Sequence, residues 1–338
     1  MKMQPELSII IVNYRSPDLV NDCIASVLRH TRELLFEIIV VDNDSGDDSR
    51  SQVLSVFPEV MWIQMSYNSG FARANNEGIR QSQGNIILLL NSDTLVENDA
   101  IGGCYRLFAA SFYGACGVQL LNTDRTPQIS GNYFMKGGLN YILPLPYLGN
   151  FVKRTGQLLK VSKPNVPNAE SLVEVDWING AFLMVKRQTV NLAGLMDEDF
   201  FLYFEETEWC SRLRKRGKLA IYGQFHVVHL QGASANETFG SEGKGYYNLY
   251  DRKGLQIMLS SFVRIRKQYG SGWFLVMLTL YILEVPVFLL GVLLTRLFMG
   301  HRGVFSFTQF RQFYKNIMFI AGKSSVILRN KPYFYKVL

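Results

Sequence analysis

Residues 7–12 read L-S-I-I-I-V and residues 36–41 read F-E-I-I-V-V, and these two apolar runs decide the fold. Each run is nearly continuous and bounded by polar residues, which is typical of a strand buried in a parallel sheet. Between them, residues 18–30 carry apolar side chains at helical spacing. A strand, a helix and a second strand in this order predict a right-handed crossover and a parallel α/β sheet.

Polar residues follow the predicted strands at the point where each strand ends. Asn13 follows the first strand, Asp42 follows the second, and the apolar run 85–90 continues into Asn91-Ser92-Asp93. Ligands of open α/β sheets bind beyond these carboxyl ends. Asp42 can hydrogen-bond a ribose or a base there, or it can form a local turn. Asp93 can hold a hard cation such as Mg²⁺ or Mn²⁺, or it can cap the next helix.

A loop and a helix start lie between these strand ends. Residues 60–64 predict a short strand, and residues 68–76 then read N-S-G-F-A-R-A-N-N. Gly70 supplies backbone freedom where the loop enters a helix, whose N-terminus would favour an anion. Arg73 and Asn75 are polar groups able to reach a ligand, although a capped helix start explains the same pattern. No G-x-G-x-x-G follows the first strand, which weighs against dinucleotide-binding dehydrogenases and P-loop proteins.

A cluster of acids stands in the second half of the chain. Residues 199–208 read D-F-F-L-Y-F-E-E-T-E, so Glu205, Glu206 and Glu208 follow an apolar and aromatic run. Such a run before a carboxylate pair indicates the edge of a core that faces a cleft. Two adjacent carboxylates raise each other's pKa there, and one stays able to accept a proton near neutral pH. The alternative is a helix N-terminus whose glutamates complement the helix dipole.

Charge is divided unevenly along the chain. The 338 residues carry 35 Lys and Arg against 28 Asp and Glu, but residues 251–338 hold 13 of the basic residues and only two acids, Asp251 and Glu284. The basic residues flank the apolar run 273–295, which is long enough to span a bilayer. This pattern favours anionic lipid over nucleic acid as a partner.

The cysteines and the N-terminus indicate the compartment. Four scattered cysteines without C-x-x-C spacing argue against a zinc site or a disulfide framework and fit a reducing compartment. Residues 1–6 are polar, and the apolar run that follows is too short for the hydrophobic core of a secretory signal. We therefore expect no signal peptide.

Seven motifs occur in the order S-I-I-I-V-N-Y, V-V-D-N-D-S, N-S-G-F-A-R-A-N-N, L-L-L-N-S-D, W-I-N-G-A-F-L, F-E-E-T-E-W and H-V-V-H. Together, over roughly residues 7–235, they resemble the family 2 glycosyltransferases of the GT-A fold, and most of all the rhamnosyltransferase-like branch that builds bacterial cell-surface polysaccharide. The resemblance implies a mixed α/β sheet flanked by helices over residues 1–240, with a nucleotide-binding half at about 1–120 and an acceptor half at 121–240. Residues 241–338 would then form a helical membrane-associating region.

The resemblance also implies a site for a nucleotide-diphospho-sugar donor. The family's aspartate after the second strand binds the nucleotide base, a role that falls on Asp42, with Asn13 at the same edge. The family's Asn-x-Gly-Phe segment lines the nucleotide and its diphosphate, which points to Asn68, Gly70, Arg73 and Asn75. The metal-binding D-x-D motif of the family reads Asn91-Ser92-Asp93 here, so Asp93 is left as the ligand for Mg²⁺ or Mn²⁺.

On the acceptor side, the resemblance assigns the segment W-I-N-G-A to the donor sugar and the acceptor, and its residues are Trp177, Asn179, Gly180 and Ala181. Gly180 and Ala181 keep side chains away where a sugar approaches the backbone. Trp177 offers an apolar face to a pyranose ring, although a structural tryptophan fits the pattern as well.

The acid pair and a histidine complete the implied site. In related enzymes the second acid of the pair is the base, which makes Glu206 the base and Glu205 an acceptor contact. Glu208 would bind the acceptor or cap the helix. A histidine a little over twenty residues after the base completes the metal site in related enzymes, and this spacing selects His229 over His226.

The tail suits a lipid-linked substrate. Basic residues on both sides of residues 273–295 favour both flanks on the cytoplasmic face of a bacterial inner membrane. Because Glu284 lies at the middle of the run, we expect a monotopic or hairpin insertion with Pro286 near its bend, ahead of a single span or a buried helix pair. A polyprenyl-diphosphate-linked saccharide acceptor would lie in that leaflet.

The expected reaction is an inverting transfer of L-rhamnose from dTDP-L-rhamnose to a lipid-linked saccharide, in the synthesis of O-antigen or another surface polysaccharide. UDP-hexoses are the alternative donors. A sugar nucleotidyltransferase would share the strand-end aspartate without needing Glu205, Glu206 or the tail. A non-catalytic membrane scaffold is the third reading, against which the acid pair and His229 argue. The sequence sets no oligomeric state.

Overall fold

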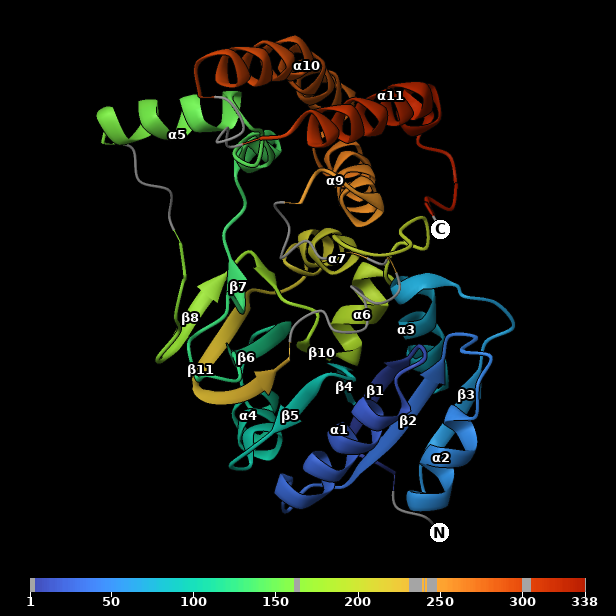
Figure 1. The fold of residues 1–338 in the computed structure, drawn as a ribbon. Coiled ribbons are helices and arrows are strands. Elements are labelled where there is room, and N and C mark those ends of the chain that lie inside the picture. Colours follow the sequence, from blue (N-terminus) through green and yellow to red (C-terminus); the bar gives the residue numbers. More distant parts are fainter. Residues whose placement is uncertain are drawn as a thin grey trace. The chain divides into compact units, whose positions relative to one another are not determined.

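A computed structural model describes residues 4–160, 165–230, 239, 241, 248–299 and 305–337. The chain divides into two compact units (Figure 1). Unit 1 comprises Met1–Tyr133, Pro164–Phe201 and Glu205–Ala235, and unit 2 comprises Phe134–Lys163, Leu202–Phe204 and Asn236–Leu338. The domain boundary expected at residue 240 falls outside the described residues and stays a prediction.

Over its described residues, unit 1 is built on a mixed sheet of nine strands in the order β3-β2-β1-β4-β10-β6-β11-β5, with β8 paired to β11. The strands are β1 (Leu7–Asn13), β2 (Phe36–Asp42), β3 (Met61–Gln64), β4 (Ile86–Asn91), β5 (Thr94–Val96), β6 (Ala115–Leu121), β8 (Leu172–Val175), β10 (Phe182–Lys186) and β11 (Leu219–His229). β1 pairs in parallel with β2 and β4, and β2 pairs in parallel with β3, as the sequence predicts. β10 enters the sheet antiparallel between β4 and β6, so the sheet is mixed.

Helices cover both faces of this sheet. They are α1 (Pro17–His30), α2 (Ser49–Val56), α3 (Gly70–Gln81), α4 (Ala100–Ala109), α6 (Arg187–Ala193) and α7 (Glu205–Leu213). Alternate residues of a strand point to opposite faces. Ile9 and Ile11 accordingly pack in one apolar core with α1, α2 and α4, whereas Ile10 and Ile39 pack in a second core with α3, α6 and α7.

A short ribbon lies beside the main sheet. β7 (Gly131–Asn132) and β9 (Trp177–Ile178) pair antiparallel. Residues 179–181 separate β9 from β10, which belongs to the main sheet. This break turns the chain between the ribbon and the main sheet.

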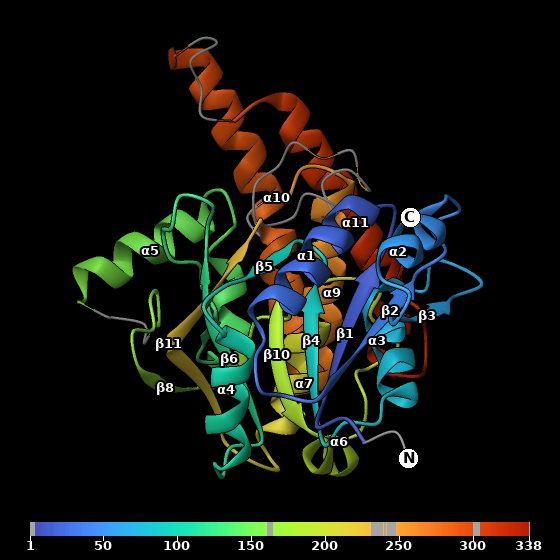
Figure 2. The same ribbon diagram turned by 90° about the horizontal axis from the view of Figure 1, so that it is seen from below.

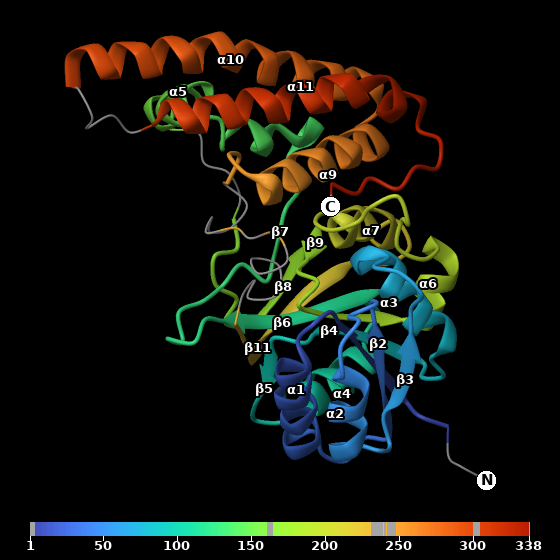
Figure 3. The ribbon, with the colours of Figure 1, turned by 45° about the vertical axis from the view of Figure 1, so that its right-hand side comes forward.

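Unit 2 is helical (Figure 3). It contains the 3₁₀-helix η1 (Lys136–Ile142) and the helices α5 (Leu148–Leu158), α9 (Arg252–Tyr269), α10 (Ser271–Met299) and α11 (Phe307–Arg329). Among the described residues, α10 is the one helix long and apolar enough to cross a membrane, and 33% of its most apolar stretch is buried in the protein.

The structure explains the two residues that break the apolar pattern of α10. The carboxylate of Glu284 is fully buried and accepts hydrogen bonds from the backbone N–H groups of Tyr147 at 2.7 Å and Leu148 at 2.9 Å. It therefore caps the N-terminus of α5, where helix N–H groups lack partners. α10 continues through Pro286 as one helix, so the expected hairpin turn at Pro286 is wrong.

Candidate active site

The carboxyl ends of β1, β2 and β4 lie side by side at one edge of the sheet (Figure 2). In the parallel register Asn13 pairs with Asp42, and Val12 pairs with Asn91. The structure thus brings together the polar residues that the sequence puts at these strand ends.

Asp42 is only 2% exposed, and its carboxylate accepts four hydrogen bonds. Asn13 Nδ2 and Ser45 Oγ donate to Oδ2, both at 2.6 Å. Ser45 N at 2.9 Å and Gln64 Nε2 at 2.7 Å donate to Oδ1. A carboxylate offers about four acceptor sites, and all of these are occupied in Asp42. A nucleotide base could therefore bind Asp42 only by replacing one of the four donors. Gln64 is exposed and can leave, whereas Asn13 is fully buried and holds Asp42 in place.

Asn43 links this edge to the loop before α3. Its Nδ2 lies 3.1 Å from Asn68 Oδ1, and its Oδ1 accepts from Ser69 N at 2.8 Å. Gly70 has a φ of +78°, and a Cβ built there would lie 2.2 Å from the carbonyl oxygen of Phe201. Glycine is required at this position for both reasons. The loop is therefore fixed at the N-terminus of α3.

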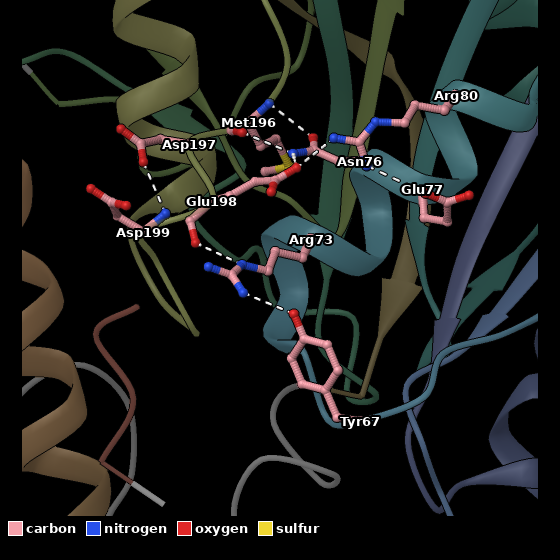
Figure 4. Close-up of polar contacts among 9 residues, drawn as sticks. All are labelled: Tyr67, Arg73, Asn76, Glu77, Arg80, Met196, Asp197, Glu198 and Asp199. Atoms are coloured by element: carbon pink, nitrogen blue, oxygen red, sulfur yellow. Dashed lines mark hydrogen bonds and ion pairs between the residues drawn. The ribbon is translucent and has the colours of Figure 1, made fainter. Parts of the chain in front are cut away.

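Arg73 and Asn75 face the protein (Figure 4 shows Arg73). Arg73 Nε donates to the carbonyl oxygen of Glu198 at 2.9 Å, and its Nη1 donates to Tyr67 Oη at 2.8 Å. Asn75 is buried and donates to the carbonyl oxygen of Phe71, one turn back, at 2.9 Å. Both residues hold α3 in position, and their contact with a nucleotide stays a prediction.

Asp93 and His229 come together although 136 positions separate them in the chain. Asp93 Oδ1 lies 3.3 Å from His229 Nε2, and His229 Nδ1 lies 2.9 Å from Gln128 Oε1. The Gln128 amide is oriented because its Nε2 donates to the carbonyl oxygen of His229 at 2.7 Å and to Asn122 Oδ1 at 2.8 Å. Its Oε1 must therefore accept from Nδ1–H, and Nε2 is the ring nitrogen that faces Asp93.

These groups fit a divalent cation. Nε2 of His229 and Oδ1 of Asp93 lie 3.3 Å apart, and adjacent ligands of an octahedral Mg²⁺ site lie about 3 Å apart. Asn91 Oδ1 is a buried acceptor without a partner among the described residues, and Asn91 Nδ2 lies 3.4 Å from His229 Nε2. The described residues hold no group of three His, Cys, Asp or Glu for a metal, so phosphate and water would supply the other ligands.

The turn between β9 and β10 connects this edge to α7. Asn179 Oδ1 accepts from Ala181 N at 2.9 Å, and the carbonyl oxygen of Ala181 accepts from Asn91 N at 3.1 Å. A Cβ built on Gly180 would lie 3.6 Å from the Glu206 side chain. The loop thus brings the end of β4 and the acid pair into one region. Trp177 is half-buried and packs against the core of α3 and α7.

Glu205 and Glu206 begin α7 and are 3% and 8% exposed. Glu205 Oε2 is buried and has no hydrogen-bond partner among the described residues. Burial first, and then the charge of Glu206, raises the pKa of Glu205 well above its usual value. Glu205 therefore holds a proton more readily than an ordinary glutamate, and its protonated form can donate a hydrogen bond.

The chain enters α7 through a constrained turn. Tyr203 and Phe204 have φ values of +72° and +69°, in the left-handed region that side chains other than glycine rarely adopt. Each such residue costs about 1–3 kcal/mol and persists only where the surrounding structure demands it. The turn sets the direction in which the helix presents Glu205 and Glu206.

Glu208, one turn beyond Glu205 on α7, is paired. Its Oε1 and Oε2 accept from Arg212 Nε and Nη2 at 2.9 and 2.8 Å, and Arg212 also donates to the carbonyl oxygen of Ala193. Glu208 therefore joins the helix to the end of α6. A contact with an acceptor stays a prediction, and Arg212 would have to share the carboxylate.

Two polar residues of this region are missing from the sequence-based set. Asn43 stands inside the quoted motif V-V-D-N-D-S, so its position beside Asp42 was a usable signal. Gln128 reaches His229 across 101 positions and has no local signal, because only the folded sheet brings β11 next to the segment after β6.

Residues 8–166 match the family model described as glycosyl transferase family 2. This region is a family 2 glycosyltransferase domain. The match begins in β1 and includes β2, α3 and the end of β4, which carry the strand-end residues described above.

Two curated proteins illustrate the relationship. The glycosyltransferase is 28% identical over 231 residues to the low-salt glycan biosynthesis hexosyltransferase Agl10 of Haloferax volcanii, covering 67% of this chain and 66% of that protein. It is 24% identical over 267 residues to an N-acetylglucosaminyl-diphospho-decaprenol L-rhamnosyltransferase of Mycobacterium tuberculosis, covering 72% of this chain and 84% of that protein. The match thus spans about two-thirds of the first relative.

A solved structure supports the fold. The mannosyltransferase PcManGT from Pyrobaculum calidifontis, in complex with GDP-Man and Mn²⁺, superposes with a TM-score of 0.51 and covers 96% of this chain and 88% of that one. The sequences are 13% identical, so the likeness concerns the fold alone. It agrees with the mixed sheet flanked by helices that the GT-A resemblance predicts, which is confirmed.

Proposed function

We propose that this glycosyltransferase moves L-rhamnose from dTDP-L-rhamnose, with inversion, onto a lipid-linked saccharide during the synthesis of a bacterial surface polysaccharide. The observation that carries the transfer chemistry is the buried pair Glu205 and Glu206, with Gly180 beside Glu206 and the strand-end edge on the same unit. The relative in Mycobacterium tuberculosis, named as an L-rhamnosyltransferase acting on a decaprenol-linked sugar, supports the donor and the acceptor class.

The donor nucleotide binds at the ends of β1 and β2 in this proposal. Asp42 takes the base as Gln64 withdraws, and Asn13 keeps the carboxylate oriented. Asn68, Gly70, Arg73 and Asn75 shape the start of α3, whose N–H groups favour the negative diphosphate. Held in this way, the diphosphate lies at the same edge of the sheet as Asp93.

Asp93 and His229 would hold Mg²⁺ or Mn²⁺, with Asn91 Oδ1 as the adjacent oxygen. When bound, the cation offsets the negative charge that develops on the departing nucleoside diphosphate. Gln128 keeps the imidazole in the tautomer whose Nε2 lone pair is available.

The acid pair activates the acceptor. Glu206 accepts the proton of the acceptor hydroxyl. As the proton leaves, the hydroxyl oxygen attacks the anomeric carbon from the face opposite the nucleoside diphosphate. The new carbon–oxygen bond forms as the bond to the diphosphate breaks, so the configuration inverts. Glu205, protonated, donates a hydrogen bond to the acceptor. Trp177, Asn179 and Ala181 border the sugar site, and Gly180 leaves room for the sugar.

Unit 2 brings the enzyme to the lipid. α10 exposes large apolar side chains along its length, and basic residues flank it on both sides. Basic flanks on both ends are typical of the cytoplasmic face. We propose that α10 lies at that face of the inner membrane, where anionic lipids and a polyprenyl-diphosphate-linked acceptor are both present.

The test is a transfer assay with the purified full chain in detergent. The protein is incubated with Mg²⁺ or Mn²⁺, a lipid-linked GlcNAc acceptor and, in separate reactions, dTDP-rhamnose or UDP-hexoses, and products are identified by mass spectrometry. A rhamnosylated lipid formed with dTDP-rhamnose, lost on chelation and in Glu206→Gln, is expected. A hexosylated lipid formed only with a UDP-sugar would contradict the donor, and exchange of sugar 1-phosphate without transfer would contradict the reaction class.

A further inference from the structure

Arg264 is a buried cation on α9 that lacks a carboxylate partner among the described residues. It is 2% exposed, its Nε is buried without a hydrogen-bond partner, and its Nη1 donates to the hydroxyl of Tyr141. A buried guanidinium without an anion is unfavourable, because it has lost its hydration and gained no counter-charge. The position therefore favours an anionic ligand.

Aromatic rings enclose the cation. The rings of Phe134, Tyr141 and Tyr269 lie 4.9, 5.5 and 5.9 Å from the guanidinium carbon. The Tyr269 hydroxyl donates to the carbonyl oxygen of Met135, so its ring is held in place. Rings over the faces of a guanidinium leave its in-plane N–H groups to bind ligands, and phosphate oxygens match that planar fork.

The acids of unit 2 do not neutralise this position. The unit carries 19 Lys and Arg but four Asp and Glu. Of these four, Asp251 and Glu284 are in the described residues, and they accept backbone N–H groups at the starts of α9 and α5, respectively. Unit 2 is therefore strongly basic in sequence, and the Nε–H of Arg264 has no hydrogen-bond partner among the described residues.

The Arg264 site also adjoins the segment that leads into the acid pair. Tyr141 packs edge-on against Phe204 with ring centroids 5.2 Å apart, and Ser260, one turn before Arg264, donates to the carbonyl oxygen of Leu202 at 2.7 Å. Phe204 is followed directly by Glu205.

We propose that Arg264 binds the diphosphate of the prenyl carrier, and so is a binding residue for the lipid-linked acceptor. The inference rests on the proposed function, and it names the element that receives the lipid end of the substrate. The exposed apolar side chains of α10, such as Leu290 and Leu293, belong to the same unit and suit a prenyl chain. The shared chemistry is a phosphate anion, which anionic headgroups and free pyrophosphate also carry.

The experiment measures binding of farnesyl diphosphate to the full chain in detergent by calorimetry, with farnesol and inorganic pyrophosphate as separate probes. Arg264→Gln should lower the affinity for farnesyl diphosphate by at least about tenfold, because it removes a charge-assisted contact. The affinity of Arg264→Lys should lie between those of the wild type and Arg264→Gln, since lysine keeps the charge and loses the planar fork. Arg252→Gln, an exposed arginine at the start of the same helix, is the matched control and should bind as wild type.

Two further measurements keep the result decisive. The thermal unfolding temperature of the wild type should rise and saturate with increasing farnesyl diphosphate, and should not rise with farnesol. This measurement tests for the site even if Arg264→Gln folds poorly. Flotation with phosphatidylglycerol vesicles should be equal for wild type and Arg264→Lys; a defect there that matches the loss of diphosphate binding would assign Arg264 to headgroups instead. Wild-type affinity in a folded Arg264→Gln would overturn the inference.

The outcome separates this inference from the proposed function. If the protein transfers sugar to a lipid-linked acceptor but its affinity for diphosphate does not depend on Arg264, the inference alone is refuted. Diphosphate binding that depends on Arg264, without transfer to any lipid-linked acceptor, would refute the proposed function alone.

Discussion

Two buried carboxylates of unit 1 are in opposite states. Asp42 accepts four hydrogen bonds, whereas Glu205 Oε2 has no partner among the described residues. A fully hydrogen-bonded carboxylate is held in one orientation by its donors, whereas a buried carboxyl without donors resists ionisation. We therefore expect the carboxyl ends of β1, β2 and β4 to hold a ligand and the start of α7 to serve proton chemistry.

Removing the charge of Glu206 tests the proton chemistry and has the largest expected effect. Glu206→Gln should lower kcat about 10²–10⁴-fold while donor binding stays near wild type, because an amide cannot accept the proton. Glu205→Gln is the matched control: it resembles the protonated carboxyl and should cost much less. Single-turnover transfer with a donor-binding assay measures both. A larger loss in Glu205→Gln would make Glu205 the base.

Replacing the Asp42 carboxylate tests whether the carboxyl ends of β1, β2 and β4 hold a ligand. Asp42→Asn puts an N–H₂ where two donors already point, so the free energy of unfolding should fall by about 1–3 kcal/mol, and nucleotide affinity should fall with it. Urea unfolding and nucleotide titration measure the two effects. Asp44→Asn, at an exposed neighbour, is the control. Unchanged stability in Asp42→Asn would show that the four hydrogen bonds contribute little.

Gln128 contacts His229, which we propose as a metal ligand together with Asp93. Gln128→Leu should weaken Mn²⁺ binding about 10–100-fold in the presence of nucleotide, because His229 loses the partner that fixes its tautomer. Gln128→Glu keeps an acceptor for Nδ1–H and should recover part of the affinity. Mn²⁺ titration followed by EPR, with ¹⁵N NMR of the histidine tautomer, gives readouts apart from activity. An unchanged tautomer with unchanged affinity would refute the role.

The sequence predicts the sheet better than it predicts the states of these carboxylates. The apolar runs at 7–12 and 36–41 set β1 and β2, because continuous burial leaves a one-dimensional pattern. That Asp42 is saturated depends on Gln64, on the next strand of the sheet, and that Glu205 is unpartnered depends on what surrounds α7. Such contacts between distant segments leave no periodicity.

The tail illustrates the same limit. Composition identifies the apolar run of α10, but it reads Glu284 and Pro286 as interruptions. The structure pairs Glu284 with backbone N–H groups some 136 positions away and continues the helix through Pro286. A buried charge in an apolar run can be explained only once its partner is known.

The pH dependence of stability tests whether burial without a hydrogen-bond partner raises the pKa of Glu205. Its folded pKa is raised above the unfolded value of about 4.3, so the folded state binds more protons between those two values. Stability must then fall as pH rises through that window and level off above the folded pKa. Glu205→Gln lacks this loss, so its urea midpoint should gain on the wild type as pH increases from 4.5 to 8. A difference that is flat with pH would contradict a raised pKa.

Glu208 offers the smallest effect and a direct contrast with Glu205, which lies three residues earlier on the same helix. Glu208 forms an ion pair with Arg212, four residues further on. Glu208→Gln removes an ion pair whose arginine is partly exposed, so unfolding free energy should fall by only about 0.3–1 kcal/mol. Arg212 keeps its hydrogen bond to the Ala193 carbonyl, which limits the damage. The KM for the acceptor should stay near wild type, since Arg212 already occupies the carboxylate. A KM that rises strongly at unchanged stability would instead give Glu208 the acceptor role that the sequence allows, and would extend the working carboxylates of α7 from two to three.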